Sequence, residues 1–411
     1  MANIYVLVPV RLILLIFHPM TLHPTLQPIL KNPPRNALRS VNRLVRIAQK
    51  VFIRLLLATF FIACSARIAY SQEQKQQQSV ISNPSPVQGS LYAARLEAMQ
   101  FADDLAARRD LDQAWVRDVM GQARNLPMVS RLMQPPAKAF VKNWRVYRSR
   151  FIDPIRIDAG VKFWRANRST LERAEKQYGV PAEIIVGIIG VETIYGRDTG
   201  SFRVMDALTT LAFDFPATHP RAKERSDFFK GEIEQFLTLQ NRRGASVVQT
   251  LSVKGSYAGA MGMPQFMPSS WAKYAVDFDG DGHIDLWNSP ADVIGSVANY
   301  FKAFNWQTGM PTHYPVSFDK SHLDMDALMA PDILPTFSVA SFAAKGAVLT
   351  GEALQHKGSL ALIELLNGPD APSYVAGTDN FYAITRYNWS SYYAMAVIEL
   401  GREVAARVRL P

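Results

Sequence analysis

The chain has 411 residues, 48% of them hydrophobic and 19% charged, a composition typical of a globular protein that folds as two or three packed units. Its net charge of +10 first suggests an anionic partner such as nucleic acid. That charge comes from residues 1–64, which hold 8 of the 45 Lys and Arg residues and none of the 35 Asp and Glu residues. The rest of the chain is nearly neutral, which excludes nucleic acid as the partner.

Residues 1–70 are predicted to be a targeting region. A basic, acid-free stretch precedes the apolar run "LLLATFFIAC", Leu55 to Cys64, as in a secretory signal, and this run is too short to predict a membrane span. Cys64 is the only cysteine, which excludes an intramolecular disulfide. "FIAC" resembles a bacterial lipoprotein cleavage box, so lipid attachment at Cys64 and simple cleavage near Ala66 or Ala69 both remain open. An organellar transit peptide is the weaker alternative.

Residues 71–90 are rich in Gln, Ser and Pro and are expected to form a flexible tether. In residues 91–411 the spacing of apolar residues is mainly helical, which predicts a mainly α body. Between about 311 and 386, the runs "TFSVASFA", "SLALIELL" and "FYAITRY" are expected to be strands of a small β-containing insertion, giving an α+β fold. A last helix is expected over about 390–408.

One carboxylate, Glu192, interrupts the apolar segment "EIIVGIIGVETIYGRD", residues 183–198. On a predicted helix its neighbours three and four positions away are apolar apart from one tyrosine hydroxyl, so the carboxylate must be paired or protonated. Burial raises the pKa of a carboxyl group, which is the condition that a general acid needs near neutral pH. Gly187, Gly190 and Gly196 indicate that a substrate or a neighbouring helix approaches the backbone closely. A structural Glu paired with an Arg is the alternative interpretation.

A second segment, "GSYAGAMGMPQFMPSSWAKYAVDFDGDGHIDLW", spans residues 255–287. Its glycines and prolines predict an irregular loop before a helix. Ser256 and Gln265 lie among aromatic and Met residues, a combination that suits a sugar with hydroxyls at its rim and apolar C–H faces. A glycine-rich turn without a ligand is the alternative.

Within this segment, "DFDGDGHIDLWN", residues 277–288, matches a calcium-binding loop at its first, third and fifth positions and has the glycine of the sixth. Because clustered carboxylates repel one another, they indicate a cation. The expected ligands are four carboxylates and one backbone carbonyl: Asp277, Asp279, Asp281, Asp285 and the carbonyl of His283. Asn288 replaces the usual Glu at the twelfth position, so Asp285 is expected to carry more of the coordination. A solvated Asp-Gly turn is the alternative, and Mg²⁺ is less suited than Ca²⁺ to so many protein oxygens.

Four motifs together resemble the lytic murein transglycosylase B family of bacterial cell-wall enzymes: "GVETIYG" (190–196), "YAGAMGMPQFMPSS" (257–270), the Asp-rich loop and "RYNWSSYYAMAV" (386–397). The resemblance covers roughly 91–408 and not the N-terminal region. It implies a lysozyme-like catalytic core around 178–310 and 380–411, additional helices, a small β-containing part around 311–386 and structural Ca²⁺ in the loop. It also implies that Glu192 is the sole catalytic acid/base, and it places six residues near the glycan: Tyr147, Ser256, Gln265, Tyr382, Tyr387 and Asn388.

The resemblance implies cleavage of the β-1,4 bond between N-acetylmuramic acid and N-acetylglucosamine, with formation of a 1,6-anhydromuramic acid end. One carboxylate suffices for this reaction because the muramyl C6 hydroxyl replaces water, whereas a glycosidase usually needs two. The implied partners are peptidoglycan strands and other cell-wall enzymes. The implied location is the periplasm of a Gram-negative bacterium, with outer-membrane attachment if Cys64 is lipidated. A hydrolytic muramidase and a non-catalytic peptidoglycan-binding scaffold are the alternatives.

Overall fold

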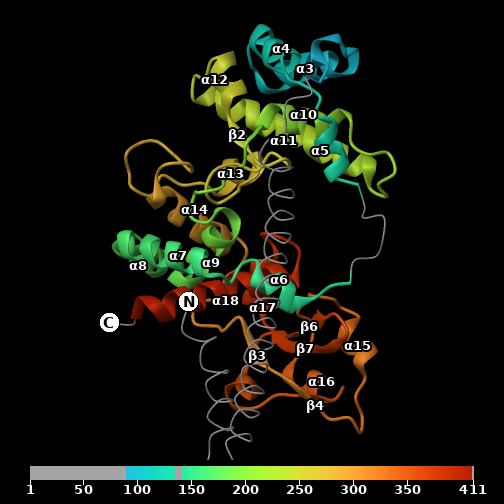
Figure 1. Ribbon diagram of the computed structural model, residues 1–411, viewed down its shortest axis with the longest axis vertical. Helices are drawn as coiled ribbons and strands as arrows, with labels where there is room; N and C mark the ends of the chain where they lie inside the picture. Colours follow the sequence, from blue (N-terminus) through green and yellow to red (C-terminus); the bar gives the residue numbers. More distant parts are fainter. Residues whose placement is uncertain (1–88, 135–140, 410–411) are drawn as a thin grey trace, which may run out of the picture. The chain divides into compact units, whose positions relative to one another are not determined.

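The centre of the fold is a pair of helices that lie far apart in the sequence. In this computed structural model, which describes residues 89–134 and 141–409, α9 (Ala182–Thr193) packs along α18 (Ser391–Arg409). Figure 1 shows the two helices side by side. Ten of the twelve residues of α9 are buried, so this helix is a core element that is apolar on nearly every side.

The predicted targeting region 1–70, with Cys64, lies outside the described residues, as does nearly all of the tether 71–90. Within the ranges that the structure does describe, no helix has both the length and the apolar character needed to cross a membrane.

Further helices surround the central pair: α7 (Pro154–Ala166), α8 (Arg168–Tyr178), α10 (Val204–Phe213), α11 (Ala222–Arg242), α13 (Pro268–Tyr274), α14 (Pro290–Ala303) and α17 (Asp379–Thr385). α7 contacts both α9 and α18, α8 joins α9 to α14, and α11 joins α10 to α13. Shorter or more peripheral helices complete this part: η2 (Tyr92–Ala94), α3 (Leu96–Arg109), α4 (Gln113–Gly121), α5 (Pro127–Leu132), α6 (Trp144–Ser149) and α12 (Val247–Ser252). A short antiparallel pair, β1 (Phe202–Arg203) and β2 (Lys254–Gly255), precedes the glycine-rich loop.

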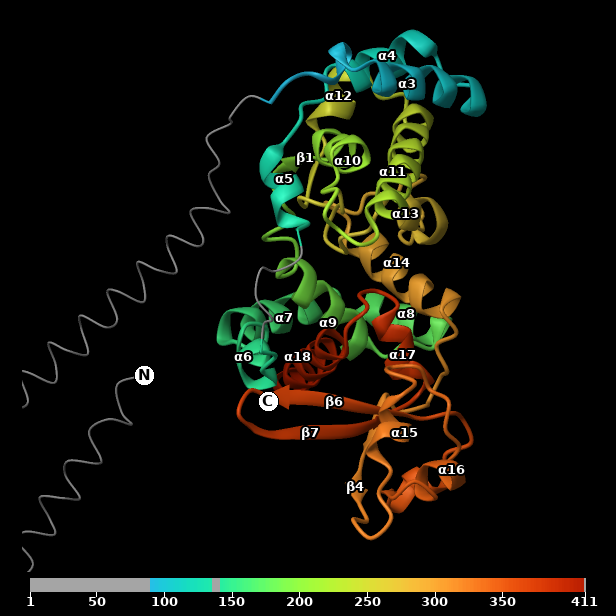
Figure 2. The ribbon, with the colours of Figure 1, turned by 90° about the vertical axis from the view of Figure 1, so that its right-hand side faces the viewer.

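A small β-containing part lies between α14 and α17. Its antiparallel sheet has the strand order β3-β7-β6, with β3 at His313–Pro315, β6 at Ala361–Asn367 and β7 at Asp370–Gly377. The remaining elements are short: β4 (Ser317–Phe318), β5 (Ala347–Val348), α15 (Met325–Met329), α16 (Val339–Ala343) and η3 (Gly351–Gln355). Figure 2 shows α18 between α9 and β6.

Strand β6 connects two hydrophobic cores. Ala361, Ile363 and Leu365 are buried in the main core with α9 and α18, whereas Leu362 is buried in a smaller cluster with Phe342. Because successive side chains of a strand point to opposite faces, one short strand contributes to both cores. The sheet is therefore covered on both sides.

The mainly α fold, the last helix and a strand within "SLALIELL" are confirmed, but the other two strand predictions are wrong. "TFSVASFA" contains helix α16 and "FYAITRY" contains helix α17. Each helix is capped by a preceding hydroxyl: Ser338 Oγ accepts from the Ser341 N–H, and Thr378 Oγ1 accepts from the Asn380 N–H. These caps favour the helix over the extended form that the β-branched and aromatic residues suggest.

Candidate active site and metal loop

The side chain of Glu192 lies in the last turn of α9 and is partly buried. Its partner is a phenol and not the Arg of the structural interpretation, because Tyr393 Oη, from buried α18, donates a hydrogen bond to Glu192 Oε1 at 2.6 Å. Burial raises the pKa of Glu192 to about 7, and the Tyr393 hydrogen bond opposes that rise. The carboxyl group can therefore both give and take a proton near neutral pH.

Other charges do not explain the shifted pKa of Glu192. In the described part of the chain, no Asp or Glu acts on this pKa, so no second carboxylate is coupled to the first. This is the charge environment expected of an acid/base that works alone.

Two tyrosines expected at the site lie close enough to Glu192 to respond to its charge. Burial first, and then the charge of Glu192, raise the pKa of Tyr147 and of Tyr387. The ring of Tyr387 lies nearly parallel to that of Tyr393, with 6.5 Å between the ring centroids. The three phenols thus come from three elements: Tyr147 from α6, Tyr387 from the segment before α18, and Tyr393 from α18.

The glycines of α9 make room for protein rather than for substrate. A Cβ atom on Gly187 would lie 2.3 Å from the carbonyl oxygen of Val397 on α18, and one on Gly190 would lie 2.5 Å from Tyr195 Oη. Tyr195 folds back under the helix because Ile194 and Tyr195 both adopt positive φ, 51° and 58°, where α9 ends. The close approach expected from the sequence is therefore that of the neighbouring helix and of Tyr195.

Hydrogen bonds bring the sequence motifs together around Glu192. Thr193 Oγ1 donates to the Met263 carbonyl at 2.8 Å, and the Met263 N–H donates to the Leu286 carbonyl at 2.8 Å. Tyr387 Oη donates to the carbonyl of Pro264. Through these bonds the glycine-rich loop is tied to α9, to the Asp-rich loop and to the segment before α18.

Ser256 and Gln265 hold the glycine-rich loop in shape. Ser256 Oγ accepts from the Ala260 N–H at 3.0 Å, and Gln265 Nε2 donates to the carbonyls of Thr199 and Gly262 at 3.1 and 3.0 Å. Gln265 itself has φ of 50°. Both side chains are partly exposed, so each retains surface for a ligand.

Tyr382 and Asn388, also expected near the glycan, flank the exposed Trp389. Tyr382 packs edge-on against Trp389, with 6.0 Å between the centroids, and Asn388 is exposed. The structure places both on the segment that leads into α18.

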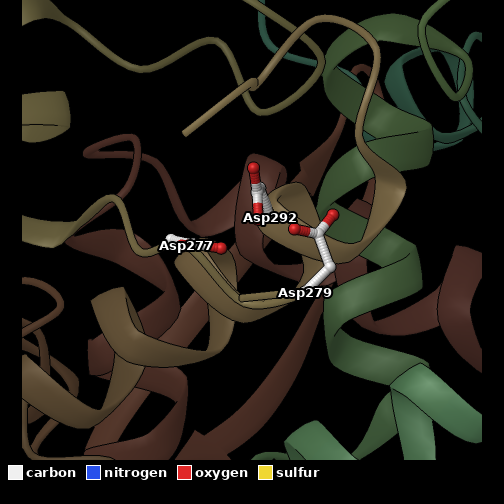
Figure 3. A group of neighbouring side chains, drawn as sticks. All are labelled: Asp277, Asp279 and Asp292. Atoms are coloured by element: carbon white, nitrogen blue, oxygen red, sulfur yellow. The ribbon is translucent and has the colours of Figure 1, made fainter. Parts of the chain in front are cut away.

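Three carboxylates gather at the Asp-rich loop: oxygens of Asp277, Asp279 and Asp292 lie within 4.8 Å of one another. Figure 3 shows these side chains at the junction of the loop and the start of α14. Asp292 is 1% exposed and accepts backbone N–H bonds from Phe278 and Asp285, both at 2.8 Å. Backbone N–H groups, foremost that of Gly282, hold the pKa of Asp277 below its usual range. This set of hard oxygen donors fits a divalent cation such as Ca²⁺.

Asp285 does not take the place expected for it. Its carboxylate accepts hydrogen bonds from the N–H groups of Trp287 and Asn288, so it caps the next turn while Asp292 joins the cluster. Asp281 and His283 remain in the exposed part of the loop, where the Asp281 carboxylate accepts from the His283 N–H. Asp292 replaces Asp285 in the group of carboxylates that the structure assembles.

Sequence reasoning missed two residues of this region. Asp292 lies fifteen residues after Asp277, beyond the twelve-residue pattern, and Asn288 at the twelfth position was the only sign that a ligand comes from elsewhere. Tyr393 lies in a run of aromatic residues in which core packing is the usual role, so nothing distinguished it.

Comparison with known proteins identifies relatives over most of the chain. The transglycosylase SLT domain family matches residues 94–402. The membrane-bound lytic murein transglycosylase B of Escherichia coli (strain K12) is 41% identical over 338 residues, which are 78% of this chain and 86% of that protein.

Two crystal structures share the fold. The soluble lytic transglycosylase SltB1 from Pseudomonas aeruginosa is 41% identical with a TM-score of 0.67, covering 76% of this chain and 99% of that one. The Escherichia coli lytic transglycosylase Slt35 in complex with calcium is 40% identical with a TM-score of 0.68, covering 79% and 97%. The expected lysozyme-like, mainly α fold is confirmed, and the chain belongs to the lytic murein transglycosylase B family.

Proposed function

We propose that this protein is a lytic transglycosylase that cleaves the β-1,4 bond between N-acetylmuramic acid and N-acetylglucosamine in peptidoglycan, with Glu192 as its only acid/base. The observation that carries the proposal is the state of this side chain. Its pKa is raised to about 7 by burial, its partner is the Tyr393 phenol, and no other carboxylate of the described residues is coupled to it. A hydrolytic muramidase would need a second carboxylate, and a binding scaffold would not need a tuned acid.

In the proposed reaction, neutral Glu192 donates its proton to the glycosidic oxygen as the bond from that oxygen to the muramyl C1 breaks. The Glu192 carboxylate then takes the proton of the C6 hydroxyl while O6 forms a bond to C1. The proton returns to Glu192, the 1,6-anhydro ring closes, and no water is consumed. Intramolecular attack is favoured because the nucleophile already belongs to the bound sugar.

The Tyr393 phenol serves the second half of this cycle. Its hydrogen bond to Glu192 Oε1 stabilises the carboxylate that remains after the first proton transfer. Burial of both groups keeps the exchange within reach of neutral pH, because it favours the neutral acid at the start.

Calcium is proposed as a structural cation of the Asp-rich loop. Asp277, Asp279 and Asp292 would hold it, with Asp281 and the His283 carbonyl on the same loop, and the calcium complex of Slt35 supports this assignment. The cation would join the loop to the start of α14, and it takes no part in the proton transfers.

The proposed location is the periplasmic face of the cell wall, with peptidoglycan strands as partner. The relative from Escherichia coli is described as membrane-bound. For this chain, one test distinguishes attachment through a lipid on Cys64 from release by cleavage near Ala66 or Ala69. Cys64→Ser should release the protein from the membrane fraction only if the cysteine carries a lipid.

The activity is tested by digestion of purified peptidoglycan with the parent protein, with Glu192→Gln and with Glu183→Gln. Glu183 lies at the start of the same helix, so Glu183→Gln controls for the loss of a carboxylate from α9. The parent and Glu183→Gln should yield anhydro ends, about 18 mass units lighter than hydrolysis products because one water is absent. Glu192→Gln should still bind but yield no ends, because the amide cannot deliver a proton.

Digestion in ¹⁸O-labelled water separates the alternatives. Unlabelled anhydro ends support the transglycosylase. Labelled reducing ends would establish a hydrolase, and binding without any new ends from the parent would establish a scaffold. Cleavage by Glu192→Gln at the parent rate would remove the assignment of the acid/base.

A further inference from the structure

A polar pocket lies away from Glu192, where the end of α11, helix α12, strand β2 and the Asp-rich loop meet. We call it the β2 pocket and define it by Gln240, Arg243, Gln249, Lys254 and Trp287, which line it. Its volume is about 520 Å³. None of these residues belongs to the group that surrounds Glu192, so the proposed reaction gives the pocket no role.

The charged side chains of the β2 pocket are cations. Arg243 and Lys254 are both exposed, and neither forms an ion pair with any carboxylate of the described residues. Asp285 is the acidic group that responds to the charge of Arg243, but its carboxylate already accepts hydrogen bonds from Trp287 and Asn288. The two cations of the pocket are therefore not held in ion pairs by the described residues, and both are exposed to an incoming anionic group.

A buried amide at the β2 pocket lacks a hydrogen-bond partner. Gln240 is 3% exposed, and its Nε2 finds no acceptor among the residues that the structure describes. A buried donor left without a partner lowers the stability of the fold. An oxygen brought by a ligand would remove that cost.

An indole forms one wall of the β2 pocket. Trp287 is partly exposed and packs against buried Trp271, with 4.8 Å between the ring centroids, which fixes its position. The Arg243 guanidinium lies 5.9 Å from the centroid of the Trp287 ring, so the cation is held beside the aromatic wall. A rigid apolar surface beside a cation suits a ligand with both methyl groups and carboxylates.

We propose that the β2 pocket is a second binding site for peptidoglycan, one that takes the carboxylates of the peptides attached to the glycan. This inference rests on the proposed function, because that function brings the peptide-bearing polymer to the protein. Arg243 and Lys254 pair with peptide carboxylates, the Gln240 amide binds a peptide oxygen, and Trp287 contacts the aliphatic part of the peptide. The site holds the polymer while Glu192 acts elsewhere on it.

Binding is measured in the Glu192→Gln background, which removes cleavage. The two probes are peptide-bearing peptidoglycan and the same glycan strands after enzymatic removal of their peptides. The double variant Arg243→Gln/Lys254→Gln should bind the peptide-bearing polymer about tenfold more weakly and the bare strands as the parent does. Arg242→Gln is the matched control, since Arg242 is the exposed neighbour that does not line the pocket, and it should change neither affinity.

Gln240→Met separates a binding role from a structural one. The thioether keeps the length of the side chain but removes the unpartnered donor, so the melting temperature should stay or rise while affinity for the peptide-bearing polymer falls. A fall in melting temperature with unchanged affinity would show a structural amide and would contradict the inference.

Two further outcomes overturn the proposal in distinguishable ways. If the double variant binds both probes as tightly as the parent, or loses both equally, the pocket does not recognise peptides, and the proposed function stands. If the parent background binds neither probe, the proposed function fails and this site fails with it.

Discussion

At the scale of single residues, two opposing effects set the proton affinity of Glu192. Burial favours the neutral acid, while the hydrogen bond from Tyr393 favours the carboxylate. Burial is the larger effect, so the pKa lies near 7 instead of near its usual 4.5. Because the first step needs the neutral acid, activity should be full below about pH 7 and should fall as the pH rises through that value.

The variant Tyr393→Phe removes the hydrogen bond that favours the carboxylate, so the pKa of Glu192 should rise further. The alkaline limb of the pH profile of kcat/KM should therefore move upward by about one to two units. The maximal rate should fall, because the carboxylate of the second step loses its donor. Profiles are recorded on purified peptidoglycan, with Tyr178→Phe on α8 as the control that leaves Glu192 untouched. A limb that stays in place would show that Tyr393 does not tune the acid.

A site residue could be predicted from the sequence where the pattern that marks it lies within one short segment. Glu192 is apparent because one carboxylate in an apolar helix is unusual within a few residues of sequence. Tyr393 lies 201 residues away, and its contact with Glu192 exists only through the packing of α18 on α9. Asp292 was missed for the same reason, since its approach to Asp277 depends on how α14 follows the loop.

At the scale of elements, the contact between α9 and α18 depends on glycines in both helices. A Cβ atom on Gly401 of α18 would lie 2.0 Å from the Glu183 carbonyl oxygen, and one on Gly187 would lie 2.3 Å from the Val397 carbonyl oxygen. Real Cβ atoms do not approach backbone so closely, so a larger residue would force the helices apart. That separation would also move Tyr393 from Glu192.

Gly187→Ala should therefore destabilise the fold by about 1–3 kcal/mol, even though alanine favours a helix over glycine. Gly231→Ala is the matched control, because Gly231 lies within α11 and a Cβ there would meet nothing within 4 Å. The control should be neutral or more stable by up to about 1 kcal/mol. Urea unfolding followed by circular dichroism measures both, and a Gly187→Ala variant as stable as the parent would contradict the packing argument.

The elements themselves were predictable where they are long and strongly periodic, as α9 and α18 are. The small β-containing part was harder to predict, because its runs of seven or eight residues fit a strand or a short helix equally well. The hydroxyls of Ser338 and Thr378 accept hydrogen bonds at the starts of α16 and α17, and these caps stabilise the helical form. The spacing of apolar residues along the sequence does not show whether such single hydrogen bonds form.

At the scale of the whole molecule, the Asp-rich loop is connected to parts of the fold that lie far apart in the sequence. It connects α13 to α14, and the bond from the Met263 N–H to the Leu286 carbonyl ties it to the glycine-rich loop that contacts Thr193. A cation bound by Asp277, Asp279 and Asp292 would hold this junction together. Calcium should thus act on the stability of the entire unit.

Calcium at a hundredfold excess over its dissociation constant should stabilise the folded protein by about 2.7 kcal/mol and raise its melting temperature. Asp292→Asn should remove most of this response, whereas Asp285→Asn should keep it, because Asp285 caps the next turn instead of joining the cluster. Asp104→Asn, an exposed position on α3, controls for the loss of one charge. Scanning calorimetry with calcium and with chelator gives the comparison. If Asp285→Asn lost the calcium-dependent rise in melting temperature and Asp292→Asn kept it, Asp285 and not Asp292 would be the ligand, as the twelve-residue pattern predicts.

The distance along the chain between Glu192 and Tyr393 also determines at which stage of synthesis Glu192 can become a proton donor. Ribosomes deliver a chain from its N-terminus, so α9 leaves the exit tunnel about 200 residues before α18. Without α18, the glycine face of α9 would lack its partner, and Glu192 would lose the Tyr393 phenol and the burial by α18 that helps to raise its pKa. A chain that ends before α18 should therefore hold Glu192 as an ionised carboxylate at neutral pH, and this carboxylate cannot protonate a glycan.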